Sequence, residues 1–177
     1  MNKEFANAVN EHPDQERQGL ERIIFFSDAV FAIAITLLAL DIRIPNTAVP
    51  LTEGALTETL ISIWPKYLGF AIGFLTIGIL WMGHHRKFQM IQSYDRNLML
   101  LNLLFLLFIA FIPFPTSIIS EYGNRTSTIF YALIVSLASL LSICVWWYAA
   151  YHNRLTSSQV DVRQRRRETQ ISLVVLG

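Results

Sequence analysis

Long apolar runs, separated by short polar and charged stretches, dominate the amino-acid sequence. Four such runs cover residues 23–44, 61–82, 98–119 and 129–150. Each comes close to the roughly 20 residues that an α-helix needs to cross the hydrocarbon core of a bilayer. No run alternates apolar and polar residues with a period of two, as a membrane-spanning β-strand would. The pattern predicts an all-α integral membrane protein built as a multi-span helical bundle.

Prolines and shorter stretches refine this division. Pro65 lies at the start of the second run, where a first helical turn tolerates it, whereas Pro113 and Pro115 should kink or end the third helix early. Segment 46–60 is polar with scattered leucines and suits one short interfacial helix. A further apolar run begins at residue 171, and it is either the start of a fifth helix or a segment that docks elsewhere.

Residues 1–21 are polar and carry several acidic side chains, including Glu4, Glu11 and Glu16. A signal peptide begins with a positive segment and continues with an apolar core, so these residues do not resemble one. We interpret 1–21 as a cytoplasmic polar tail. Residues 22–177 then form the transmembrane domain, with helices over the four runs and from residue 171 onward.

The positions of Lys and Arg predict the orientation of the chain. Eleven of the 14 lie in the amino-terminal tail and first turn, after the second run, or after the fourth run. Three lie on the other side, namely Arg43, Lys66 and Arg125. We therefore expect a multi-pass protein of the cell membrane with a cytoplasmic amino terminus. The basic stretch 163–167 is interpreted as an anchor for this topology, and binding to acidic lipid headgroups is the alternative.

Composition supports a membrane protein and excludes other classes. Of the 177 residues, 53% are hydrophobic and 15% are charged, against roughly 25% charged in ordinary globular chains. This balance excludes intrinsic disorder, and the single cysteine excludes a disulfide-stabilised scaffold. The net charge of +1 gives no field that would attract nucleic acid, so the expected surroundings are the lipid bilayer.

No pattern typical of an enzyme or a metal site is present. Cys144 lies in the middle of the fourth run and is interpreted as a small core residue rather than a nucleophile. His84 and His85 are adjacent, so they cannot share one helix face as metal ligands. The sequence has no glycine-rich phosphate loop. We expect no enzymatic activity, no metal and no cofactor.

Asp28 lies one to two turns inside the first predicted helix. An ionised carboxylate is costly in hydrocarbon unless it has a partner, so we expect a functional role or an essential hydrogen bond; solvation near the headgroups is the alternative. A buried acid would also suit an ion-coupled secondary transporter, although the broken helix pairs typical of such proteins are not found. A purely structural membrane protein is a third possibility.

Helical periodicity assigns the side chains of the first helix to faces. Ile33, Leu37 and Leu40 fall within an arc of about 60° and form an apolar stripe. Small residues lie beside this stripe and permit close approach of another helix: Ala29, Ala32, Thr36 and Ala39. Asp28 lies beyond the small residues and should point to a neighbouring helix. By periodicity alone, an apolar stripe more often faces lipid or core than a pore.

The start of this helix carries a specific motif. Residues 22–28 read Arg-Ile-Ile-Phe-Phe-Ser-Asp, or R-x-x-x-F-S-D, and Ala-Val-Phe-Ala-Ile-Ala-Ile-Thr-Leu-Leu follows. Trp-Met-Gly-His-His at 81–85, Asn102, and Pro-Phe-Pro at 113–115 agree with the same pattern. Over about residues 20 to 120, the chain resembles the prokaryotic branch of the transmembrane protein 175 family of potassium channels.

The resemblance implies a subunit of six helices, of which four are complete here with the start of a fifth, and assembly as a homotetramer. It implies that the first helix lines the pore of a potassium-selective leak channel that has no filter of backbone carbonyls; potassium is then the permeant ion. The main constriction would be at Ile33, with further apolar layers at Leu37 and Leu40 and with Thr36 as a nearby polar contributor. Such a ring can gate by dewetting and hold back hydrated ions.

The resemblance also implies a structural polar network. Arg22, Ser27 and Asp28 of the first helix would bond with polar groups of the second and third helices. The candidates there are Trp81, His84 and Asn102. Donor and acceptor types agree, because arginine and the indole only donate and a carboxylate only accepts.

Overall fold

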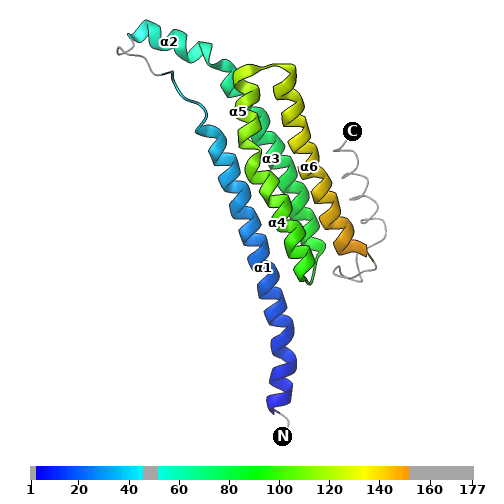
Figure 1. Ribbon diagram of the computed structural model, residues 1–177. Coiled ribbons are helices and arrows are strands. Elements are labelled where there is room, and N and C mark those ends of the chain that lie inside the picture. The colour runs from blue at the N-terminus through cyan, green and yellow to red at the C-terminus, as the bar shows by residue number, and fades with distance from the viewer. Residues whose placement is uncertain (1–2, 46–51, 152–177) are drawn as a thin grey trace.

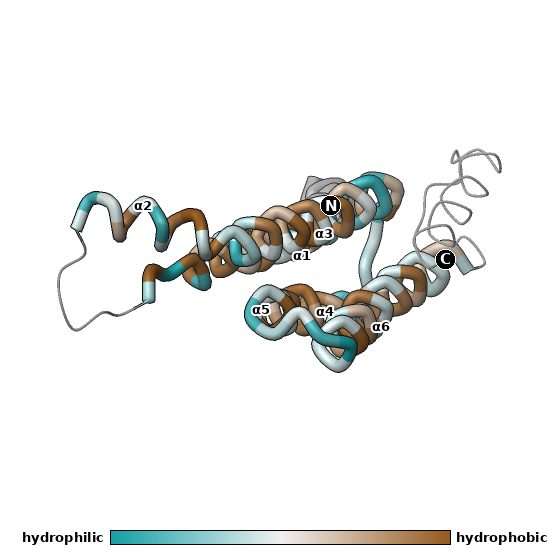
Figure 2. Tube along the Cα trace, turned by 90° about the horizontal axis from the view of Figure 1, so that it is seen from above, coloured by the Kyte–Doolittle hydropathy of each residue, from teal (hydrophilic) through white to brown (hydrophobic). Residues whose placement is uncertain are grey.

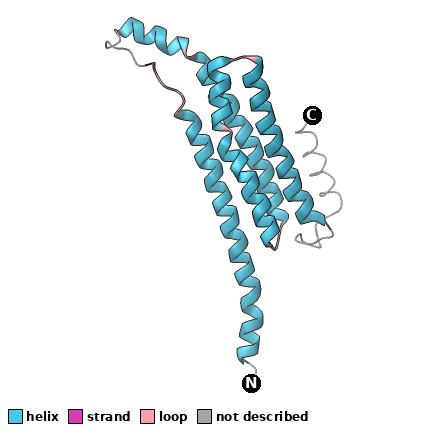
Figure 3. Cartoon of the chain, viewed as in Figure 1, coloured by secondary structure: helices cyan, strands magenta, loops and turns pink. Residues whose placement is uncertain are grey.

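The described part of the chain consists of six helices and the short connections between them. The computed structural model describes residues 3–45 and 52–151 (Figure 1). The helices are α1 Lys3–Ala39, α2 Glu53–Ser62, α3 Trp64–Met90, α4 Arg96–Phe111, α5 Pro113–Tyr122 and α6 Arg125–Ala150 (Figure 3). Four helical segments are long and apolar enough to cross a membrane: Gln15–Ala39, Trp64–Met90, Arg96–Tyr122 and Arg125–Ala150. The predicted all-α, multi-span bundle is confirmed, while the run from residue 171 lies outside the described residues.

The first helix begins earlier than the apolar pattern indicates. Its backbone is helical from Lys3, so no break separates the predicted polar tail from the membrane-crossing segment. The apolar run predicted from residue 23 thus continues a helix that already contains the polar residues before it. The polar residues extend a helix that the apolar run nucleates, because adding a residue to an existing helix costs far less than starting one.

The same helix also ends earlier than predicted, at Ala39 instead of near residue 44. Two side-chain interactions hold the following residues in a turn. Arg43 Nε donates to the Leu40 carbonyl oxygen at 2.9 Å. Asp41 Oδ1 accepts a hydrogen bond from Ser117 Oγ of α5 at 2.7 Å. The predicted helix end was wrong because these contacts divert the chain before Pro45 is reached.

Two prolines interrupt the third membrane-crossing segment, as predicted. α4 ends at Phe111, and α5 begins at Pro113 after the single residue Ile112. Pro113 has no N–H to give to the preceding turn. The Ile109 carbonyl oxygen instead accepts from the Ile112 N–H at 3.2 Å. The prolines thus divide the span Arg96–Tyr122 into two helices that meet at Ile112, whose backbone angles remain helical.

Segment 46–60 was expected to hold a short helix, and the structure has α2 at its end. Thr52 is the N-cap of α2, and its side chain accepts a hydrogen bond from the Ala55 N–H at 3.4 Å. α2 contains no buried residue, and it leads into α3 through Ile63. It therefore connects the first two spans without joining the core.

The core of the bundle lies between α1, α3, α4 and α6. In Figure 2, α1 and α3 lie together on one side, and α4, α5 and α6 lie on the other. The largest fully buried side chains come from both sides: Phe31, Ile77, Phe88, Leu98, Phe105 and Ile109. Cys144, predicted as a core residue, is exposed on α6. That prediction was wrong because a membrane helix is apolar all round, so hydropathy does not distinguish its inner face from its outer one.

Small residues allow α3 and α5 to approach closely. A Cβ atom on Gly69 would lie 2.7 Å from Ser120 Cβ, and one on Gly73 would lie 3.0 Å from Thr116 Cγ2. Close backbone approach of this kind is the usual basis of helix association in a bilayer, where burial of apolar surface gives little net gain.

We expect Gly69→Ala to destabilise the purified protein by about 1–3 kcal/mol, because the added methyl group must push α3 and α5 apart. Gly78→Ala is the matched control, since a Cβ atom at Gly78, on the same helix, meets nothing within 4 Å. The control should be neutral or slightly stabilising, because alanine favours a helix over glycine. Thermal unfolding in detergent measures both. Equal melting temperatures for the two variants would contradict the close α3–α5 contact.

Candidate functional site: the exposed face of α1 and its polar anchor

α1 has a buried face and an exposed face. Phe31, Ala34 and Leu38 point into the bundle and are 1%, 1% and 3% exposed. On the opposite side, Ile33 is 58% exposed and Leu37 is 43% exposed. The predicted apolar stripe is thus the face of α1 that the described part of the chain leaves uncovered.

Thr36 and Leu40 also belong to this uncovered surface, Thr36 on the helix and Leu40 in the turn that follows it. The Thr36 hydroxyl donates to the Ile33 carbonyl oxygen at 2.8 Å, so it is satisfied within α1. Leu40 is 60% exposed. It was placed on the helical stripe by periodicity, and this was wrong, because α1 ends one residue before it. Leu40 follows the exposed face in a turn rather than on the helix.

Behind the exposed face, a chain of hydrogen bonds joins three helices. Asn102 of α4 donates from Nδ2 to Ser27 Oγ of α1 at 3.0 Å. The Asn102 amide oxygen lies 3.0 Å from Nε2 of His84 on α3. All three side chains are buried. Asn102 is therefore the centre of a polar contact that ties α1, α3 and α4 together.

The hydrogen bond from Ser27 to Ile23 determines which group donates and which accepts in the bonds that join Ser27, Asn102 and His84. The Ser27 hydroxyl donates to the Ile23 carbonyl oxygen, at 2.8 Å, so its oxygen is left to accept from Asn102. The amide oxygen of Asn102 then faces His84 and only accepts, so His84 Nε2 carries the proton. One assignment satisfies each of these groups, as buried polar groups require.

Aromatic rings surround the imidazole of His84. It stacks on Phe88 with ring centroids 4.2 Å apart and on Phe105 at 5.6 Å. Phe31 of α1 is tilted against it at 5.5 Å. These contacts fix the plane of the imidazole and hence the direction of its bond to Asn102.

Asp28 points away from the apolar stripe and toward α3, as its predicted azimuth indicates. Its Oδ1 accepts a hydrogen bond from Trp81 Nε1 at 2.8 Å. The indole in turn stacks on His85, with ring centroids 5.4 Å apart. A second polar contact between α1 and α3 thus lies beside the first.

The structure brings together five of the six residues that the resemblance assigns to the network. Arg22 is not joined to them: it is exposed and forms no hydrogen bond or ion pair with a described residue. It instead lines a cavity between α1 and α4 that Asn102 also lines.

The sequence reasoning missed a buried charged residue, Lys87. Lys87 is 5% exposed, and its Nζ donates to Ser142 of α6, to the carbonyl oxygen at 3.1 Å and to Oγ at 2.8 Å. Its position three residues after His84 puts both on one face of α3 and was the available signal. It was counted with the connection instead, because Arg86 precedes it.

The site offers structural hydrogen bonds and an apolar surface, not reacting groups. Among the described side chains, no group of three or more His, Cys, Asp or Glu lies close enough together to hold a metal ion. What the arrangement supports chemically is a rigid α1 that presents one face outward.

Comparison with known proteins identifies the family. The family model described as "Endosomal/lysosomal potassium channel TMEM175" matches residues 22–113, which include the motif, Trp81, His84 and Asn102. The chain belongs to the TMEM175 family. The predicted resemblance is confirmed at this level, and the TMEM175 family is one of ion channels rather than enzymes.

Similar TMEM175 relatives cover most of the chain. A potassium channel of Streptomyces collinus is 38% identical over 150 residues, which are 82% of this chain and 71% of the relative. The crystal structure of a lysosomal potassium-selective channel TMEM175 homolog from Chamaesiphon minutus matches with a TM-score of 0.72 and 33% identity, covering 90% of this chain and 85% of that one. The human endosomal/lysosomal proton channel TMEM175 is 32% identical over 77% of this chain but only 29% of its own length.

We expect Asn102→Ala to lower the melting temperature of the purified protein markedly, because it leaves Ser27 and His84 buried without their partner. An unsatisfied buried group costs about 1–3 kcal/mol. Asn97→Ala is the control, since Asn97 lies on the same helix but is exposed, and within the described residues its side chain bonds only to the Tyr148 hydroxyl, at 3.3 Å. An equal effect of the two variants would show that Asn102 is not the centre of the polar anchor.

Proposed function

We propose that the chain is one subunit of a potassium-selective leak channel in which α1 lines the pore. The observation that carries the proposal is the two-faced character of α1. Its buried side is tied to α3 and α4 by hydrogen bonds, and its uncovered side presents Ile33, Thr36 and Leu37. The names of the Streptomyces and Chamaesiphon relatives support potassium as the permeant ion.

The channel we propose is a homotetramer in the cell membrane. Ala29 and Ala32 are exposed beside Ile33 on α1. Small residues of this kind let identical helices approach a common axis closely. Four copies of α1 would then bring Ile33 and Leu37 into apolar layers, with Ile33 as the main constriction and Leu40 as a further layer in the turn after α1. Narrow apolar layers disfavour water and hydrated ions, which is how such a pore would close and select.

An ion-coupled transporter that uses Asp28 is not favoured. The Asp28 carboxylate accepts from the Trp81 indole and points to α3, so it is placed to hold two helices together rather than to load an ion. Family membership agrees, because the relatives are channels.

The predicted orientation places the amino-terminal end of α1 and the α3–α4 connection in the cytoplasm. We expect Gln92→Cys, in that connection, to react with a membrane-impermeant thiol reagent only from the cytoplasmic side. Glu58→Cys, on α2, should react only from the opposite side. Both residues are exposed, and Cys144→Ser removes the native thiol. Labelling of both from the same side would overturn the topology.

The pore assignment is tested by the reversal potential of Ile33 variants in a bilayer with potassium on one side and sodium on the other. The wild type should follow the potassium gradient. Ile33→Ala and Ile33→Asn should raise conductance and lower the discrimination against sodium several-fold, because a wider or wetter constriction admits hydrated ions. Currents that follow a pH gradient instead would contradict potassium selectivity.

Ile79 provides the matched control for these variants. It lies on α3 and is 49% exposed, close to the 58% of Ile33, but it is not on α1. Ile79→Ala and Ile79→Asn should leave the reversal potential unchanged. Phe31 is unsuitable despite lying opposite the stripe, because it is buried and its truncation would leave a cavity. An unchanged reversal potential in both Ile33 variants, with normal assembly, would remove Ile33 from the pore.

A further inference from the structure

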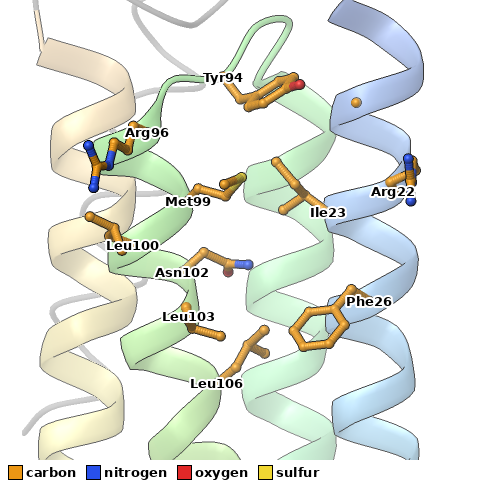
Figure 4. A pocket seen from close by; sticks show the side chains of 11 residues that line it. Arg22, Ile23, Phe26, Tyr94, Arg96, Met99, Leu100, Asn102, Leu103 and Leu106 are labelled. Carbon is orange, nitrogen blue, oxygen red and sulfur yellow. The ribbon is translucent and has the colours of Figure 1, made fainter.

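A groove runs along the bundle between α1 and α4. It comprises two adjoining cavities of about 450 and 570 Å³, and both are lined by Phe26, Leu100, Leu103 and Leu106. Figure 4 shows Phe26 on the α1 wall and the leucines on the α4 wall of the first cavity. Leu100 and Leu103 are exposed. The described part of the chain therefore leaves an apolar groove open along one flank of α1.

The other flank of α1 presents a large side chain. Phe25 is 71% exposed, more than any other large hydrophobic residue that the structure describes. Because Phe25 and Phe26 are neighbours in an α-helix, their side chains point about 100° apart. Ala29 and Ala32 lie beside Phe25 and are exposed as well. We call these three residues the Phe25 flank: one aromatic side chain projects there beside two small ones.

The two flanks carry opposite charge near the start of the apolar run of α1. Three charged residues line or adjoin the groove: Arg22, Arg96 and Asp95. Three others line a cavity between α1 and α3 on the opposite flank: Glu16, Arg17 and Glu21. Asp95 stays negative although its partners are neutral donors, so two arginines face one carboxylate on the groove side. Two carboxylates face one arginine on the other side, and Asp28, bonded to Trp81 of α3, adds a further negative charge there.

Rotational symmetry determines which surfaces meet when identical subunits form a closed ring. One flank of each copy then contacts the opposite flank of the next. A rotation about the membrane normal also keeps every residue at its own depth. Phe25 of one copy therefore lies level with Phe26 on the groove wall of the next, since the two are about 1.5 Å apart along the helix axis. Glu21 lies level with Arg22 for the same reason.

We propose that the groove between α1 and α4 receives the Phe25 flank of the next copy of this chain. Phe25 enters the groove against Leu103, and the Glu21 carboxylate pairs with Arg22 across the contact. The inference rests on the ring assembly proposed above and adds which surfaces form it. A second copy is favoured over lipid because the α1 wall of the groove is continuous with the exposed stripe that carries Ile33. A ring that places Ile33 at its axis also closes the groove.

Cysteine crosslinking in a Cys144→Ser background tests the contact. Two coexpressed full chains, one with Phe25→Cys and the other with Leu103→Cys, should form a disulfide-linked dimer under mild oxidation. Either chain expressed alone should stay monomeric on a denaturing gel, because each flank meets the other flank and not itself. Leu140→Cys replaces Leu103→Cys in the matched control, since Leu140 is similarly exposed but lines neither cavity, and it should give no dimer.

Reversal of charge tests the pairing of Glu21 with Arg22. Glu21→Arg and Arg22→Glu should each raise the protein concentration needed for half assembly about tenfold, because several like-charged contacts then replace ion pairs around the ring. The double variant should recover most of this loss. Arg125→Glu, at the first position of α6 and in neither cavity, should assemble like the wild type. Light scattering after size-exclusion chromatography in detergent measures all four.

Three results would overturn the proposal: no mixed dimer, equal crosslinking of the Leu103 and Leu140 pairs, or no recovery in the double charge reversal. These readouts do not depend on ion conduction. Mixed dimers together with an unchanged reversal potential in the Ile33 variants would retain this contact and remove the pore assignment. An altered reversal potential without mixed dimers would retain the pore assignment and remove this contact.

Discussion

A polar side chain inside a bilayer cannot turn to water, and the arrangement of α1, α3 and α4 depends on this constraint. Three helices that lie far apart in the sequence contribute Ser27, His84 and Asn102. All three side chains are buried, and each forms a hydrogen bond with another of the three. A rotation of α1 would break the bond from Asn102 to Ser27 and leave the buried Asn102 Nδ2 group without this acceptor. Apolar packing in lipid tolerates many helix rotations, whereas a hydrogen-bonded chain with one consistent set of donors does not. The network thus determines which face of α1 is turned outward.

The fold was largely predictable because a bilayer imposes lengths and hydropathy on the helices. Four spans, a break at Pro113 and a short helix before α3 all followed from local patterns. Helix ends were less predictable. α1 stops at Ala39 because Asp41 bonds to Ser117, a residue 76 positions away, and no local pattern reports that contact. The inner and outer faces of α6 were not distinguishable either, so Cys144 was assigned to the wrong side.

Only those residues of the candidate site that belong to the family pattern could be predicted from the sequence. The resemblance supplied Ser27, Asp28, Trp81, His84 and Asn102, and the structure joins them by hydrogen bonds. It did not indicate that Arg22 would stand apart from them and line a cavity between α1 and α4. Lys87 was missed because a lysine next to an arginine was assigned to the segment that connects two helices. The long side chain of a lysine near a helix end can nevertheless extend into the bundle. The spacing of three residues between His84 and Lys87 indicated that both lie on one face of α3, whereas the hydropathy of Lys87 did not.

The hydrogen bonds of Asp41 connect the carboxyl-terminal end of α1 to α5. Asp41 accepts from Ser117 and from Ser120, both on α5, and α5 is separated from α4 by the proline break at Ile112. Ile112 keeps helical backbone angles, and its N–H and carbonyl groups bond to Phe108 and Thr116, so α5 is held in line with α4. If α5 swings, the residues after Ala39 must travel with it or both serine bonds must break. The position of Asp41, and of Leu40 directly before it, is therefore coupled to that of α5.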